Sequence, residues 1–220
     1  MKGPRLHPAE ETLLGFAGGQ ADLPLRMLVE THLAGCPACA AVVVELRALG
    51  GALLAALDAG AAPSGLWERL SSRLDVESRP TQSSPLPGLT LPPAAVAELP
   101  PGPALRWRRA WGLGGEMALV AEDTGTGSRL LAGRMRGGRA FPKHQHTGPE
   151  DVVVLVGGYD DHLGAYEVGD YAAYAPGSVH QPTTEPDEGC AILVRLESPN
   201  RFFGWRGALQ RLFLQYPRYP

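Results

Sequence analysis

The chain has 220 residues, of which 44% are hydrophobic and 20% charged, a balance typical of globular domains and unlike that of a disordered chain. Three cysteines in a chain of this size argue against a disulfide framework and favour a reducing compartment. The first eight residues lack the apolar core of a signal peptide, and no uninterrupted run of 18 apolar residues occurs. We therefore expect a cytoplasmic protein without a membrane span.

The net charge of −3 is unevenly distributed. Residues 1–77 contain six basic and nine acidic side chains, whereas residues 104–220 contain thirteen of each. Binding to nucleic acid requires clustered Lys and Arg side chains. We therefore expect no direct contact with nucleic acid, and a basic protein surface suits the acidic N-terminal region better as a partner.

Three helices are expected near the N-terminus. Residues 9–19 form the first, with acidic residues in its first turn and glycines at its end. Residues 22–33 form the second, with Asp22 as its cap. The third runs from residue 37 to about residue 57 and is the most apolar segment of this region.

A group of metal-binding side chains falls between the second and third of these helices. His32, Cys36 and Cys39 have the spacing His-x3-Cys-x2-Cys. Pro37 is favoured at the first position of a helix, which would place both thiols in the opening turn. Two thiolates and an imidazole suit a tetrahedral zinc site that lacks one ligand. The other histidine of the first 140 residues, His7, is the predicted fourth ligand.

Two other interpretations of this group were weighed. A Cys-Pro-x-Cys pair can be a thioredoxin-like redox motif, but that motif needs a βαβ setting and the flanks here are helical in pattern. Two unrelated buried thiols beside a chance histidine are the other alternative. Zinc is favoured, because a small helical bundle gains folding free energy from a structural metal.

Residues 63–77 predict a fourth helix with a narrow apolar stripe among charged and polar side chains. The stripe is formed by Leu66, Trp67, Leu70 and Leu74. A Gly-Ala-Ala-Pro segment precedes this helix, so it can stand away from the first three. The stripe therefore either packs on its own bundle or binds a partner protein, and the sequence alone leaves both open.

Residues 78–103 contain eight prolines and predict an extended linker, which we take as the domain boundary. Beyond it, short β-like segments alternate with Gly, Asp and Pro, as in an antiparallel sandwich or barrel. These segments are residues 105–108, 117–120, 129–132, 151–156 and 191–194. Residues 199–220 contain four arginines and several aromatic side chains and predict a short amphipathic helix that closes the barrel.

A second group of possible metal ligands lies within the β region. His144 and His146 are two residues apart on a strand and therefore face the same side. Glu150 follows after a turn, and His180 follows a Pro-Gly turn about 30 residues later. Three imidazoles and one carboxylate suit zinc, iron, manganese, nickel or copper.

These two stretches are similar to the two motifs of the cupin family. The first runs from Gly138 through the two histidines and Glu150 to Gly157 and matches the cupin pattern at every fixed position. The second, from Gly169 to His180, has its proline one place late, and Thr184 stands where many cupins have asparagine. A cupin shell whose histidines only hydrogen-bond one another is the alternative to a metal site.

The combination resembles the zinc-binding anti-sigma factors of the ChrR type, over essentially the whole chain. The resemblance implies an α+β multidomain protein. Residues 1–77 would form a zinc-binding helical bundle and residues 104–220 an antiparallel β-barrel or sandwich, the cupin, joined by the linker 78–103.

The resemblance also implies a function in transcription regulation and the oxidative stress response. The helical module would sequester an extracytoplasmic-function sigma factor, and the cupin would trigger release on an oxidative signal such as singlet oxygen or a peroxide. Zinc in the first module would be structural, and the cupin would hold a second divalent metal. The protein would then be no enzyme; the alternative is a metal-dependent cupin dioxygenase or isomerase acting on a small molecule.

Overall fold

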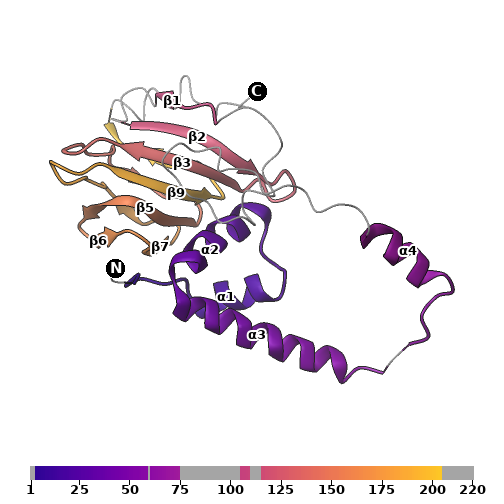
Figure 1. The fold of residues 1–220 in the computed structure, drawn as a ribbon. Coiled ribbons are helices and arrows are strands. Elements are labelled where there is room, and N and C mark those ends of the chain that lie inside the picture. Colours follow the sequence, from indigo (N-terminus) through magenta and orange to yellow (C-terminus); the bar gives the residue numbers. More distant parts are fainter. Residues whose placement is uncertain (1–2, 59, 75–104, 110–114, 205–220) are drawn as a thin grey trace.

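The computed structural model describes residues 3–58, 60–74, 105–109 and 115–204, and within these it has a helical region followed by antiparallel sheets (Figure 1). The helices are α1 (Glu10–Ala17), α2 (Leu23–Gly35), α3 (Pro37–Ala55) and α4 (Leu66–Leu74). The strands are β1 (Arg108–Arg109), β2 (Gly115–Glu122), β3 (Arg129–Met135), β4 (His144–Gln145), β5 (Glu150–Asp161), β6 (Gly164–Glu167), β7 (Tyr171–Tyr174), β8 (Val179–His180), β9 (Cys190–Leu196) and β10 (Arg201–Phe202).

The helices begin where the sequence predicts. The Asp22 carboxylate accepts a hydrogen bond from the Leu25 backbone N–H at 2.8 Å, and Pro24 lies in the first turn of α2. α2 ends at Gly35, two residues later than expected, and Cys36 is the single residue between α2 and α3. Cys36 also serves as the cap of α3, since its sulfur accepts from the Cys39 N–H.

The β region has the expected antiparallel architecture. One sheet has the strand order β1-β2-β3-β9-β5-β6, with β7 also paired to β5, and a second sheet has the order β10-β4-β8. In the second sheet the register places His144 directly opposite His180. The predicted fold class, a helical bundle followed by an antiparallel cupin barrel or sandwich, is confirmed.

The helical region and the large sheet share one hydrophobic core. Buried side chains of α2, among them Met27, Leu28 and Val29, cluster with Val153 of β5 and Leu193 of β9. Figure 1 shows α1, α2 and the start of α3 beside the sheet, while α4 lies apart from them. The linker 78–103 lies outside the described residues, so its extended form stays a prediction, but the regions on its two sides are in direct contact.

One helix of the described residues, α3, bears on the expectation that the chain has no membrane span. This 19-residue helix has a mean hydropathy of 1.8 and is long and apolar enough to cross a membrane by length and composition. Glu45 and Arg47 interrupt its apolar run, and length and composition alone do not contradict the expectation. Only 11% of the apolar window is buried, so most of this helix presents apolar side chains on the outside of the protein.

The predicted closing helix at the C-terminus falls almost entirely outside the described residues, which end at residue 204. At the start of that segment Arg201 and Phe202 form β10 and pair with β4.

Candidate metal centres

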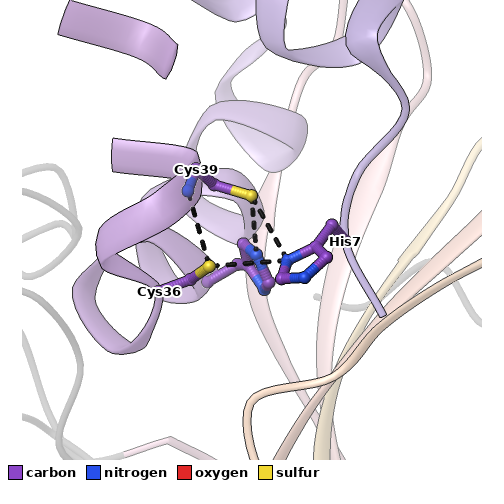
Figure 2. A group of neighbouring side chains, drawn as sticks. His7, Cys36 and Cys39 are labelled. Carbon is purple, nitrogen blue, oxygen red and sulfur yellow. Dashed lines mark hydrogen bonds between the residues drawn. The ribbon is translucent and has the colours of Figure 1, made fainter. Parts of the chain in front are cut away.

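The first candidate centre lies where the N-terminal segment meets the start of α3 (Figure 2). Nδ1 of His7 lies 3.4 Å from Sγ of Cys36 and 3.4 Å from Sγ of Cys39. Nε2 of His32 lies 3.4 Å from Sγ of Cys39. One nitrogen or sulfur from each of the four residues falls within 4.8 Å of all the others. The structure therefore brings all four predicted ligands together.

These distances fit a tetrahedral zinc ion. Zn–N bonds of about 2.0–2.1 Å and Zn–S bonds of about 2.3 Å place tetrahedral neighbours about 3.5 Å apart. The four side chains would fill every position of such an ion and leave none open, as in structural sites. The predicted placement of both thiols in the opening turn of α3 is confirmed, with Cys36 as cap and Pro37 as first residue.

Burial shifts the pKa values of two residues of this cluster. Burial and the neighbouring Cys36 sulfur together raise the pKa of Cys39 to about 11. A bound cation would therefore have to displace the Cys39 proton. Burial also lowers the pKa of His32, so its ring is neutral and able to act as a ligand.

The second candidate centre lies inside the cupin region. His144 and His180 face each other across the β4–β8 pair with their Nε2 atoms 3.0 Å apart, and Nε2 of His146 lies 3.3 Å from Oε1 of Glu150. All four side chains are buried, and their ligand atoms lie within 4.8 Å of one another. The four residues predicted from the cupin motifs therefore form one cluster.

Each histidine of this cluster is oriented through its other ring nitrogen. Nδ1 of His144 donates to the Pro142 carbonyl at 2.9 Å, and Nδ1 of His180 donates to Oδ2 of Asp161 at 2.7 Å. Nδ1 of His146 bonds the Ser178 hydroxyl at 2.8 Å. These bonds place the proton on Nδ1 and direct the Nε2 lone pairs into the cluster, which is how metal-binding histidines are held.

Further observations show that the cluster fits a metal cation. Nε2 of His146 is buried and, apart from its 3.3 Å approach to Glu150, has no polar partner within the described residues. Burial lowers the pKa of His144 to about 4 and also lowers that of His180, so both rings are neutral at physiological pH. Burial opposes ionisation of Glu150, but its interactions with His146 and His144 and the hydrogen bond from Asn200 outweigh it and lower the pKa of the carboxyl. Neutral imidazoles and a carboxylate are the forms that bind metal.

A cavity of about 100 Å³ opens beside this cluster and is large enough for several water-sized groups. His144, Glu150 and His180 lie at its wall, and most of the remaining surface is apolar. The apolar part is formed by Met117, Met135, Phe141, Val152, Tyr159, Cys190, Ile192, Val194 and Leu196, among others. The side chains that could hold a metal therefore lie at the wall of a largely apolar cavity.

The predicted partner-binding stripe lies on α4, away from both clusters. Trp67 is 70% exposed and Leu70 is also exposed, while Leu66 is half-buried. The side chain of Leu74 lies outside the described part of the chain. The alternative in which Trp67 and Leu70 pack into the helical bundle is therefore not what the structure shows.

Two residues beside the cupin cluster escaped the sequence analysis. Asp161 holds His180, and Asn200 donates to Oε2 of Glu150 at 2.6 Å. No spacing rule pointed to them, because each acts from another part of the chain. Thr184, at the place of the usual asparagine, is buried and donates to the Arg136 carbonyl at 2.8 Å, which ties down the loop before β4.

Comparisons with known proteins agree with this architecture. Residues 103–199 match the model of the ChrR cupin-like domain family. The anti-sigma-E factor ChrR of Cereibacter sphaeroides is 30% identical over 203 residues, which span 90% of this chain and 92% of that protein. The crystal structure of Rhodobacter sphaeroides SigE in complex with the anti-sigma ChrR contains a chain with a TM-score of 0.72 and 26% identity, covering 88% of this chain and 99% of that one.

Each of these two matches is named as an anti-sigma factor. The similarity extends over nearly the full length of this chain. The chain therefore belongs to the ChrR family of anti-sigma factors.

Proposed function

We propose that this anti-sigma factor binds an extracytoplasmic-function sigma factor in the cytoplasm through its helical region and releases it when the cupin region meets an oxidant. The observation that carries this proposal is the docking of a Cys2His2 cluster on a cupin that contains its own ligand cluster and cavity. The crystallised relative is a complex of an anti-sigma factor with a sigma factor, which supports the same kind of partner here.

The partner surface is formed by apolar side chains that the fold leaves exposed. On and just beyond α3 these are Val42, Val44, Leu49, Leu53, Leu54 and Leu57, and on α4 they include Trp67 and Leu70. Large exposed apolar patches mark binding sites rather than ordinary protein surface. The acidic balance of residues 1–77 complements the basic surface with which a sigma factor binds promoter DNA.

The two clusters have different roles in this proposal. His7, His32, Cys36 and Cys39 would hold a structural zinc ion that fixes the start of α3 relative to α2. His144, His146, Glu150 and His180 would hold a divalent metal, such as zinc, iron, manganese, nickel or copper, beside the cavity. When bound there, a redox-active metal would supply reactivity toward an oxidant such as singlet oxygen or a peroxide.

The residues around the cupin cluster form a site that suits a small apolar oxidant. The apolar wall excludes most water from the cavity, and Asp161 and Asn200 hold His180 and Glu150 in place. The competing route is direct oxidation of Cys36 and Cys39. Because fully ligated thiolates on a structural metal are less exposed than an open cupin site, the cupin route is favoured.

Binding of the full chain to an extracytoplasmic-function sigma factor of the same organism, measured by calorimetry, tests the anti-sigma part. Addition of an organic hydroperoxide to the preformed complex then tests the release part. We expect a tight one-to-one complex that dissociates after oxidant is added. Absence of binding to every such sigma factor would contradict the first part, and a complex that survives the oxidant would contradict the second.

A further inference from the structure

A turn of the cupin region lies directly against the N-terminal segment that ends in His7. The carboxylate of Asp170 accepts hydrogen bonds from the backbone N–H groups of Arg5 at 2.7 Å and Leu6 at 3.2 Å. The next residue, Tyr171, donates its backbone N–H to the Leu6 carbonyl at 3.0 Å. These three bonds fix the backbone immediately before His7, so that its ring meets the two thiols.

The same turn also orients the second histidine of the cluster. Nδ1 of His32 donates to the Gly169 carbonyl at 2.8 Å. Because a carbonyl can only accept, the proton lies on Nδ1, and Nε2 is left to face the sulfur of Cys39. Two adjacent residues of the cupin, Gly169 and Asp170, therefore determine the positions of both imidazoles in the N-terminal cluster.

The contact between this turn and the N-terminal segment is buried and closely packed. Asp170 is 1% exposed, and its second oxygen accepts from the Glu167 N–H at 3.0 Å, which holds the carboxylate in place. Gly169 has φ +89°, and a Cβ there would lie 2.8 Å from Cγ of Pro4. A larger residue would therefore push the N-terminal segment away from the turn.

The strand that follows this turn reaches the cupin cluster. The ring of Tyr171, at the start of β7, contacts His32 edge-on with 5.9 Å between centroids. The ring of Tyr174, at the end of the same strand, lies 4.4 Å from the ring of His180 and 5.0 Å from that of His146. A single four-residue strand thus contacts both candidate metal centres.

We propose that Gly169 and Asp170 are positioning residues for the N-terminal metal centre. The Gly169 carbonyl supplies the outer hydrogen bond of His32, and the Asp170 carboxylate fixes the backbone that carries His7. This inference rests on the proposed zinc site. Outer hydrogen-bond partners typically change metal affinity by about 10–100-fold when they are removed. The cupin region would thereby control how firmly the helical module holds its metal.

The test uses the full chain with Co²⁺ in place of zinc, because thiolate-to-cobalt absorption reports the Cys2His2 centre and the cupin cluster has no thiolate ligand. The measurement is the rate at which excess EDTA removes this absorption. The variant is Asp170→Ala, and Asp170→Asn, which keeps one acceptor oxygen, serves as the conservative rescue. The matched control is Glu167→Ala, since the Glu167 carboxylate lies in the same turn and pairs with the Arg5 guanidinium at 3.5 Å, while its backbone bonds to Asp170 are kept in the variant.

We expect Asp170→Ala to release Co²⁺ about 10–100-fold faster than the original protein and to shift its absorption bands. Asp170→Asn should fall between the two, and Glu167→Ala should match the original. If Asp170→Ala has the same release rate and spectrum as the original protein, the inference is overturned, whereas the assignment of the zinc site still stands. If the original protein shows no thiolate-to-cobalt absorption, the proposed zinc site itself fails. Should Asp170→Ala not fold, the folded Asp170→Asn variant decides: an original release rate there contradicts the inference.

Discussion

The guanidinium of Arg195 on β9 forms a buried ion pair with the carboxylate of Asp22, the cap of α2, at 3.2 Å. Arg195 also pairs with Asp151 at 3.1 Å and with Glu197 at 2.6 Å. One arginine of the sheet thus holds the N-terminus of a helix that carries a zinc-ligand candidate at its other end. From this contact and the shared core we expect the helical region and the cupin to unfold together.

Removal of this arginine should destabilise the whole protein. Arg195→Met would leave buried carboxylates without a cation, which typically costs about 3–5 kcal/mol. The free energy of unfolding in urea measures the loss. Arg129→Met, which breaks the more exposed pair with Glu122 at 2.8 Å, is the control and should cost about 1 kcal/mol or less. Equal effects of the two substitutions would contradict a special role for the Arg195 contact.

The same ion pair predicts a dependence on pH. Burial opposes ionisation of Asp22, but the Leu25 N–H and the Arg195 guanidinium outweigh it and lower the pKa of the carboxyl below its ordinary value of 3.8. A carboxyl with a lowered folded-state pKa stabilises the fold above its unfolded pKa and loses this contribution as the pH falls through the folded pKa. The stability difference between the original protein and Asp22→Asn should therefore be largest near neutral pH and shrink below about pH 4. A stability difference between the two proteins that grows as the pH falls would contradict this prediction.

Loss of one thiolate should release the zinc. Cys36→Ser removes both a ligand and the side chain that caps α3. A structural zinc supplies about 10 kcal/mol or more of apparent binding free energy in small zinc-finger peptides, so the start of α3 should lose order. Zinc content and far-ultraviolet circular dichroism measure this. Cys190→Ser, which changes a buried thiol outside the cluster, should keep the zinc. Full zinc content in Cys36→Ser would refute the ligand assignment.

Exposed apolar side chains of the helical region should carry the affinity for the sigma factor. Trp67→Ala should weaken binding by about 2 kcal/mol or more if the indole is an anchor at the interface. Leu163→Ala, at another exposed site, on the β5–β6 turn, is the matched control and should leave the dissociation constant unchanged. Equal dissociation constants for Trp67→Ala and the control would exclude Trp67 from the interface.

The sequence was informative where local rules apply. The cap at Asp22, the His-x3-Cys-x2-Cys spacing and the first cupin motif each depend on neighbouring residues, and all eight predicted ligands fall into two clusters. Their assignment as metal ligands stays a prediction. The docking of α2 on the sheet was not predictable, because Arg195 and Asp22 are 173 residues apart and nothing in either segment identifies the other.

Two further features of the structure could not be predicted from local sequence patterns either. The Gly169–Asp170 turn was recognised only as part of a cupin motif, although its carbonyl and carboxylate contact the N-terminal cluster. α3 is the most apolar segment of the helical region, but its apolar side chains are exposed along most of its length. Periodicity shows which side chains are apolar and does not show whether the chain itself or a partner covers them.

The central claim, that the cupin senses the oxidant, is tested most directly by transcription from a sigma-dependent promoter in cells that carry His144→Ala. The control is His162→Ala, because His162 is exposed and belongs to neither cluster. Repression before oxidant is added shows that both variants still bind the sigma factor. We predict that a hydroperoxide or singlet oxygen induces transcription in the control and not in His144→Ala. Normal induction in His144→Ala would contradict the cupin-sensor account and point to oxidation of Cys36 and Cys39 instead.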